Sequence, residues 1–347
     1  MKKQRPTLQT IAEIAGLSKS AVSRALRNDP MQSIKTCERV QKIAADIGYA
    51  ANPVINALMS DLRTGRQGRR TGTIAVIDFW NKKGGWKTWP NLTIFLEGIK
   101  DQIDEFNLAY DYFWYWEQDL TPRRLNQIIQ TRGIVGMIIL PVESSDTTIE
   151  LDLSRYALAT MGYSLKKPNI HRSARNFIGD ISNALEMLRQ RGFNKIGLVE
   201  PADIEERNNY FWSAGYYTFD LSAADSGHVP ILRSSNYHRP ELREQAYQEF
   251  SCWYREHKPE VVVGSNLHVL KFIERMGLKV PRDVAYFDLD LLEDDGKVDG
   301  VYFDWSRVGA ATVDMVIDQI NRNERGIPRD PKLTLINGQI VTGKTLL

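Results

Sequence analysis

Apolar residues near the start of the chain recur with the period of an α-helix, at positions i, i+3, i+4 and i+7: Leu8, Ile11, Ala12 and Ala15. Thr7 precedes this run as a predicted N-cap, and Gly16 breaks the helix after it. The pattern therefore predicts a short first helix that buries one of its sides.

Two more short helices are predicted directly after the first. Ser18 is placed to cap a second helix over residues 19–26, which turns Val22, Ala25 and Leu26 inward. Thr36 is the predicted cap of a third helix, whose inner side carries Val40, Ile43, Ala44 and Ile47. Two helices joined by a tight turn that contains glycine, and braced by a third, form a helix-turn-helix unit.

The outward side of the second helix is polar, as a helix that lies in the DNA major groove requires. Arg24 is predicted to make a bidentate contact with guanine, and Lys19 and Ser20 to reach nearby base edges. Phosphate contacts, which position the unit without reading sequence, are predicted for Thr7, Ser18 and Ser23. The alternative is that these residues form only a solvated helix face.

From residue 71 onward the pattern changes to alternating strands and helices. Apolar runs predict buried strands at residues 73–77, 134–140, 195–199, 260–263 and 283–287, with an amphipathic helix over residues 92–106. Such alternation is typical of the α/β class, with parallel sheets covered on both faces. So long a segment exceeds one core, so we expect two lobes, with a ligand cleft beyond the carboxyl ends of the strands.

Composition fits a soluble protein, with 42% hydrophobic and 25% charged residues among 347. We expect no membrane contact and a cytoplasmic location, because no apolar run approaches ~20 residues and the basic start lacks an apolar signal region. Residues 1–70 carry 13 basic residues against 5 acidic ones, whereas the remainder is acidic overall. A basic head on an acidic body suggests that the head meets a polyanion.

The head is also similar to a known family. Residues 6–26, followed by Thr36-Cys37-Glu38-Arg39-Val40 and by Gly48-Tyr49, resemble the opening of the lactose-repressor (LacI/GalR) family of transcription regulators. The resemblance implies a homodimer that binds a palindromic DNA operator as a repressor, and it adds Ala21 to the DNA-contacting positions. Ala21 stands where the family frequently has threonine.

Residues 51–70 are predicted to form a hinge helix and a basic linker. Asn52 can cap this helix, and Pro53 suits its first turn. The family resemblance implies that Leu58 wedges into the minor groove at the operator centre, with Ile55 one turn earlier. The alternative is a linker that packs on the body.

The body resembles the periplasmic-binding-protein-like sensor of the same family in residues 180–199, 277–285 and 308–313. The predicted domains are therefore a DNA-binding head over residues 1–50, the hinge over 51–70, and a two-lobed ligand-sensing and dimerisation domain over 71–347. The resemblance implies that a small-molecule effector, a carbohydrate, controls DNA binding.

Predicted effector contacts come from two sources. The resemblance aligns Asp290 with a ligand-gripping aspartate, Asn266 with an asparagine whose acidic neighbour is lost, and Trp212 with an arginine. The exit of the first strand adds aromatic residues that suit a sugar ring, Trp80 and Trp89 with Trp86 between them, and Asn91 close by.

Catalytic motifs are missing from the sequence. It has no phosphate-binding glycine loop, no nucleophile elbow and no histidine pair with metal spacing, so we expect neither an enzyme nor a cofactor. Two alternatives to a ligand-gated regulator stay open: a cytoplasmic sugar-binding or sugar-processing protein, and a ligand-independent DNA-binding protein with a vestigial cleft.

Overall fold

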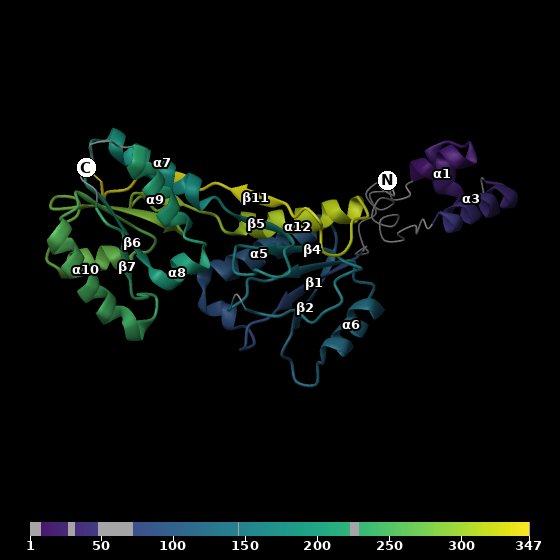
Figure 1. The fold of residues 1–347 in the computed structure, drawn as a ribbon, viewed down its shortest axis with the longest axis horizontal. Helices are drawn as coiled ribbons and strands as arrows, with labels where there is room; N and C mark the ends of the chain where they lie inside the picture. The colour runs from purple at the N-terminus through teal and green to yellow at the C-terminus, as the bar shows by residue number, and fades with distance from the viewer. Residues whose placement is uncertain (1–7, 27–31, 48–71, 145, 223–228, 347) are drawn as a thin grey trace. The chain divides into compact units, whose positions relative to one another are not determined.

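The described part of the head contains three short helices (Figure 1). The structure is a computed structural model that describes residues 8–26, 32–47, 72–144, 146–222 and 229–346. Within it, the head helices are α1 (Leu8–Ala15), α2 (Lys19–Ala25) and α3 (Ile34–Asp46). Their shared core contains Ile11, Ala12, Ala15, Val22, Ala25, Cys37, Val40 and Ala44. The predicted inner faces are thus confirmed wherever the side chains are described.

The turns of the head explain where its helices begin. Gly16 has a φ of 63°, a left-handed conformation that glycine adopts without strain, and it allows the tight turn into α2. Ser18 caps α2 as predicted, because its hydroxyl accepts a hydrogen bond from the Ala21 N–H at 3.2 Å. The predicted cap of α3 was wrong. The helix begins at Ile34, and the Ser33 hydroxyl accepts from the Thr36 N–H at 3.2 Å.

The chain divides into two compact units, residues 1–67 and 68–347. The second unit, the body, contains two six-stranded sheets. The first sheet has the order β11-β5-β4-β3-β1-β2, and all its neighbouring strands are parallel. Its strands are β1 (Thr73–Asp78), β2 (Ala109–Trp114), β3 (Gly136–Ile139), β4 (Ala157–Met161), β5 (His171–Arg175) and β11 (Leu333–Ile336).

The second sheet has the order β12-β10-β9-β8-β6-β7 and is parallel except for the antiparallel β10–β12 pair. Its strands are β6 (Ile196–Pro201), β7 (Leu232–Ser234), β8 (Val261–Gly264), β9 (Ala285–Leu291), β10 (Gly300–Tyr302) and β12 (Gln339–Val341). We call the parts of the body built on the first and second sheets lobe 1 and lobe 2.

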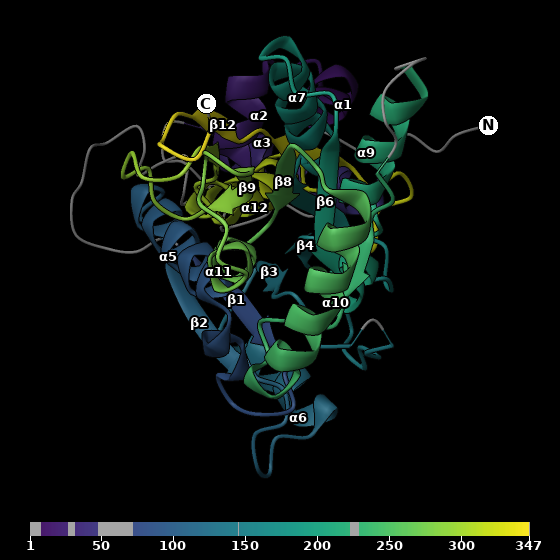
Figure 2. The same cartoon turned by 90° about the vertical axis from the view of Figure 1, so that its left-hand side faces the viewer.

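Helices cover both faces of each sheet, as the predicted doubly wound α/β class requires. Lobe 1 carries α5 (Pro90–Glu105), α6 (Pro122–Thr131), α12 (Ser306–Asn321) and a short 3-10 helix, η1 (Gly85–Thr88). Lobe 2 carries α7 (Phe177–Gln190), α8 (Ala202–Arg207), α9 (Phe211–Ser222), η2 (Pro240–Leu242), α10 (Arg243–His257) and α11 (His268–Arg275). Figure 2 shows α7 and α11 on opposite sides of the β8–β9 part of the second sheet.

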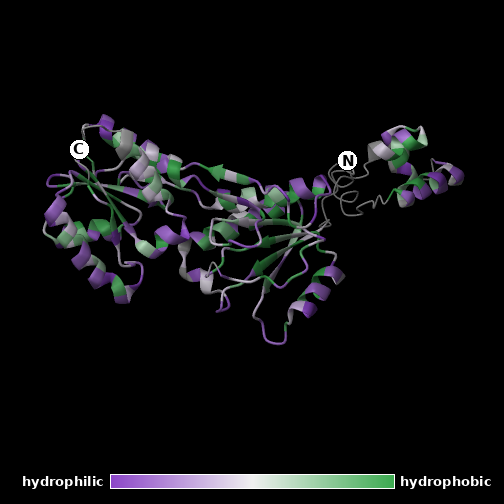
Figure 3. Ribbon diagram, in the orientation of Figure 1, coloured by the Kyte–Doolittle hydropathy of each residue, from purple (hydrophilic) through white to green (hydrophobic). Residues whose placement is uncertain are grey.

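Hydrophobic residues concentrate in the strands, whereas helices such as α6 and α10 also carry hydrophilic residues (Figure 3). In lobe 1, Leu125 and Ile129 of α6 pack on one face of the sheet together with Met137. The neighbouring Gly136 lies against Val316 of α12 on the other face, since successive strand residues point to opposite sides. Among the described residues, no helix is long and apolar enough to cross a membrane.

Along its described part, the chain passes between the two lobes at three points. The connections run from β5 to α7, from β10 to α12, and from β11 to β12. Each lobe is therefore assembled from segments that lie far apart in the sequence. The cleft between the lobes lies beyond the carboxyl ends of parallel strands, where open α/β sheets bind ligands.

Candidate functional site

Helix α2 carries the residues predicted to read DNA. Lys19 is exposed, whereas Ala21 and Arg24 are half-buried. The Arg24 Nε is buried and has no hydrogen-bond partner among the described residues. Ser20 and Ser23 lie on α2, but their side chains lie outside the described part. The predictions for Thr7, Asn52, Ile55 and Leu58 fall wholly outside the described residues.

The helices of the head are braced against one another by a charged contact. The Arg39 guanidinium of α3 donates a hydrogen bond to the carbonyl oxygen of Ala15, the last residue of α1. A cation at a helix C-terminus also interacts favourably with the helix dipole. This contact fixes α1 against α3, and the shared core of the head then holds α2 in place.

A cavity of about 1010 Å³, which we call the outer cavity, lies between the lobes of the body. Its floor and walls include polar and aromatic side chains from both lobes: Trp80, Trp89, Asn91 and Glu143 from lobe 1, and Arg207, Asn236, His238, Ser265, Asn266, His268, Asp288 and Asp290 from lobe 2. A second space of about 120 Å³, the inner hollow, shares Trp89, Arg207 and Asp290 with it. Phe95, Tyr163, Phe177 and Trp305 add aromatic walls to the inner hollow.

The structure brings together most of the predicted effector residues. The outer cavity is lined by Trp80, Trp89, Asn91, Asn266 and Asp290. Trp212 is the exception, because it is 1% exposed and lines neither space. Its ring packs edge-on against Phe177 at 4.9 Å, behind the wall of the hollow. A direct effector contact by Trp212 therefore does not fit its position.

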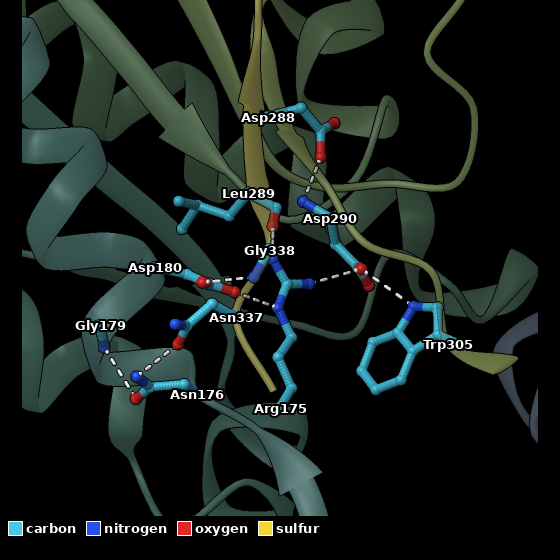
Figure 4. A network of polar contacts seen from close by, with 10 residues as sticks. All are labelled: Arg175, Asn176, Gly179, Asp180, Asp288, Leu289, Asp290, Trp305, Asn337 and Gly338. Atoms are coloured by element: carbon cyan, nitrogen blue, oxygen red, sulfur yellow. Dashed lines mark hydrogen bonds and ion pairs between the residues drawn. The ribbon is translucent and has the colours of Figure 1, made fainter. Parts of the chain in front are cut away.

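A residue that the sequence did not single out, Arg175, occupies the centre of the site (Figure 4). Its side chain is fully buried at the end of β5. The Arg175 Nε lies 2.6 Å from the Asp180 carboxylate, and one terminal nitrogen lies 2.7 Å from the Asp290 carboxylate. The other terminal nitrogen donates to the Leu289 carbonyl oxygen at 2.6 Å. One guanidinium from lobe 1 thus binds three acceptors in lobe 2.

The same network joins all three connections between the lobes. Arg175 ends β5, before the first connection. Trp305, which precedes α12 on the second connection, donates from its indole to Asp290 at 3.2 Å. On the third connection, the Gly338 N–H donates to Asp180 at 2.8 Å. Because Asp290 also lines the outer cavity, a group bound there would contact the network that joins the lobes.

Comparison with known proteins identifies the head. Residues 7–52 match the family model described as "Bacterial regulatory proteins, lacI family". This match covers 46 of the 347 residues and lies within the first compact unit of the chain.

Two curated relatives match part of the chain. The HTH-type transcriptional regulator CelR of Thermobifida fusca is 30% identical over 76 residues, which is 22% of this chain and 20% of the relative. The HTH-type transcriptional regulator GntR of Pseudomonas aeruginosa is 41% identical over 56 residues, 16% of each chain. The matched segments thus span about a fifth or less of these relatives.

Solved structures show the same fold over the full length. A complex of the regulator CelR with cellobiose is similar with a TM-score of 0.59 at 17% identity, covering 98% of this chain and 100% of the other. The Lac repressor dimer bound to operator and the anti-inducer ONPF has a TM-score of 0.57 at 16% identity, covering 99% and 100%. The predicted fold, a helix-turn-helix head followed by a two-lobed α/β body, is confirmed.

Two arginines bring guanidinium groups to the cleft, although Trp212 stands where the family resemblance implies an arginine. The Arg175 guanidinium lies 5.1 Å from the centre of the Trp212 ring and 4.5 Å from that of Phe303. The second is Arg207, which lines both spaces. Neither arginine could be predicted, because β5 and α8 read as polar segments and each arginine takes partners from the other lobe.

Buried acids of lobe 2 form the floor beside this network. Burial raises the pKa of Asp288 to about 7, although the Asp290 N–H and the Tyr286 hydroxyl both donate to its carboxylate. Burial also raises the pKa of Glu200 well above its ordinary range, against the effect of its hydrogen bond from Ser265 at 2.7 Å. Protonated carboxyl groups therefore persist here at near-neutral pH.

Replacing Asp288 with asparagine should flatten the pH dependence of stability. The folded-state pKa of Asp288 lies above the unfolded value of about 3.9, so its contribution to stability is present below about pH 4 and is lost as pH rises through about 7. Asparagine does not titrate, so Asp288→Asn should gain on the order of a few kcal/mol relative to the unmodified chain between about pH 4 and pH 8. Urea unfolding at several pH values measures this difference.

The control is Asp283→Asn. Asp283 is exposed and its pKa is lowered, first by the hydrogen bond from Arg282, so it stays ionised throughout this window. Its replacement should shift stability by a constant amount. Parallel pH profiles for Asp288→Asn and the unmodified chain would contradict the pKa assigned to Asp288.

Proposed function

We propose that this chain is a transcription regulator that binds a palindromic operator in the cytoplasm as a homodimer, acts there as a repressor, and is gated by a small carbohydrate. The observation that carries the proposal is the match of residues 7–52 to the lacI-family model, with Lys19 exposed and Arg24 half-buried on α2. One head reads only a half-site, so a palindrome and a paired copy are expected together.

Each part of the head has a proposed role. Arg24 and Lys19 read base edges together with Ser20 and Ala21, and Ser18, Ser23 and Thr7 contact phosphates. Asn52, Ile55 and Leu58 belong to the proposed hinge helix, in which Leu58 enters the minor groove. Arg39 supports this arrangement because it ties α3 to the end of α1.

The body supports effector gating. Two lobes joined by three connections enclose a cavity with aromatic and polar walls, which suits a polyhydroxylated ring. A relative with this fold is known as a complex with cellobiose. An effector held between the lobes would favour one lobe arrangement and so shift the population of DNA-binding dimers. The polar floor of the cavity speaks against a vestigial cleft, the alternative in which DNA binding ignores metabolites.

Arg24→Ala tests the proposed reading of DNA. An operator is first selected from random duplexes, and affinity for it and for a scrambled duplex is then measured by fluorescence anisotropy. Because a bidentate arginine–guanine contact discriminates by about 1–3 kcal/mol, the variant should lose roughly 5- to 100-fold in operator affinity relative to the scrambled duplex.

Lys42→Ala is the matched control. Lys42 is exposed on α3, so its replacement removes the same charge without touching α2. It should lower both affinities by similar factors, because charge loss weakens binding to all duplexes. A ratio of affinities that is unchanged in Arg24→Ala would reject α2 as the recognition helix.

A further inference from the structure

Arg207 is placed unusually for a charged side chain. It is the last residue of α8 in lobe 2, and it reaches across the cleft to lobe 1. There its guanidinium lies 5.4 Å from the centre of the Trp89 ring and 6.0 Å from that of the Trp80 ring. It lines both the outer cavity and the inner hollow, so it stands where the two spaces meet.

The guanidinium of Arg207 makes few hydrogen bonds to the described part of the chain. An arginine offers five N–H donors, and one of them, at the first terminal nitrogen, donates to the Glu143 carbonyl oxygen at 3.0 Å. Within the described part of the chain, no carboxylate oxygen lies within 4.0 Å of its nitrogens, although Glu143 and Asp203 are near enough to attract it. Burial lowers the pKa of Arg207, against these attractions. A half-buried cation with donors to spare favours an anionic partner.

Two acids of the outer cavity, Asp288 and Asp290, are already engaged. Asp290 is paired with Arg175 at 2.7 Å, and Asp288 accepts hydrogen bonds from Tyr286 and from the Asp290 backbone. Arg239, another cation of this wall, lies 3.7 Å from Asp203. An anionic group of a ligand can therefore pair with Arg207 where the two spaces meet.

We propose that the effector is an acidic carbohydrate, whose carboxylate or phosphate group binds Arg207 between Trp80 and Trp89. This inference rests on the proposed function, because it specifies the ligand of the same cleft. The sugar hydroxyls donate to Asp290 and bond to the amides of Asn91 and Asn266, which line the same cavity. Aromatic faces hold the apolar side of the ring, and a bidentate guanidinium recognises the planar or tetrahedral anion.

The test compares neutral sugars with their acidic counterparts on the full chain. D-glucose is paired with D-glucuronate and D-glucose 6-phosphate, and D-galactose with D-galacturonate and D-galactose 6-phosphate, so that carboxylate and phosphate are distinguished. Isothermal titration calorimetry should show an acidic member that binds about tenfold or more tightly than its neutral parent. Arg207→Gln should lose at least about tenfold for that member and little for the parent.

Two further variants keep the result interpretable. Arg207→Lys retains the charge without the bidentate geometry, so it should bind the acidic member more weakly than the unmodified chain but more tightly than Arg207→Gln. Arg255→Gln removes an exposed cation from α10, outside both spaces, and should change binding by less than about threefold. An unchanged melting temperature without sugar shows that Arg207→Gln is folded.

The outcomes separate this inference from the proposed function. A neutral sugar that binds tightly and is indifferent to Arg207→Gln would overturn the acidic effector while supporting carbohydrate gating. It would leave Arg207 as a contact between the lobes. If no sugar of either charge binds and operator affinity ignores all of them, carbohydrate gating falls as well. The operator-binding result for Arg24 is independent of both.

Discussion

Arg175→Met should destabilise the body by about 3–5 kcal/mol, because it leaves buried carboxylates without their cation. The Arg175 side chain has no exposed surface, and that of Asp180, 2.6 Å away, is 2% exposed. Methionine fills a similar volume but offers no donor to Asp180, Asp290 or the Leu289 carbonyl oxygen. Unfolding followed by tryptophan fluorescence reports on the body alone, since all eight tryptophans lie beyond residue 71.

Arg132→Met is the matched control. Arg132 pairs with Asp111 at 2.7 Å, the distance that also separates Arg175 from Asp290. The side chains of Arg132 and Asp111, however, are 54% and 30% exposed. Water screens this pair, so its loss should cost less than about 1 kcal/mol. Equal effects of the two variants would show that burial does not set the strength of the Arg175 network.

A second variant separates charge from packing. If the orphaned carboxylate causes the loss, Asp180→Asn should recover part of the stability of Arg175→Met, because an amide is less costly to bury than an unpaired charge. If lost packing against Trp212 and Phe303 causes it, the double variant should be no more stable than Arg175→Met. The double-mutant cycle measures this coupling.

The sequence pattern predicted the strands that are buried on both faces of their sheets. The apolar runs that form β1, β3, β6, β8 and β9 lie inside their sheets and are covered on both faces, so they read as continuous hydrophobic stretches. The head was predictable for the same reason, since each of its short helices contributes one regularly spaced face to a single core.

Other strands could not be predicted, because their burial depends on distant segments. β5 reads His-Arg-Ser-Ala-Arg, yet most of it is buried. His171 accepts from the Lys332 N–H at 2.9 Å, and the Ser173 hydroxyl bonds to α12 at 2.8 Å. These partners lie 161 and 135 residues away in the chain. The edge strands β7 and β12, and β10 beside β12, are three residues long and carry no clear period.

Some residues of the candidate cleft could be predicted from the sequence, and others could not. Trp80, Asn266 and Asp290 follow predicted strands, so their meeting at the carboxyl edges could be foreseen. Arg175 and Arg207 could not, because each is held by the opposite lobe. The family alignment placed a cleft residue at Trp212, whereas the structure buries that ring behind the wall and supplies guanidinium groups from other elements.

Gly309→Ala should destabilise lobe 1, although alanine is the better helix former. At an unconstrained helix position this change gains about 1 kcal/mol. In α12, however, a Cβ added at Gly309 would lie 2.1 Å from the Phe95 carbonyl oxygen of α5. Likewise, a Cβ added at Gly98 of α5 would lie 2.0 Å from the Ser306 carbonyl oxygen of α12. Both obstacles are backbone atoms, so the helices must separate. Overpacking of this kind costs about 1–3 kcal/mol or more.

Arg307→Ala on the exposed side of α12 is the control and should change stability by no more than about 0.5 kcal/mol. Gly98→Ala should resemble Gly309→Ala, and the two together should cost less than their sum, because the first separation of the helices makes room for the second methyl group. Urea unfolding measures all four variants. A stabilised Gly309→Ala would mean that α5 and α12 do not approach each other as closely as these glycines allow. Because α12 follows directly from Trp305, such a change would also alter how the second connection between the lobes is anchored to Asp290.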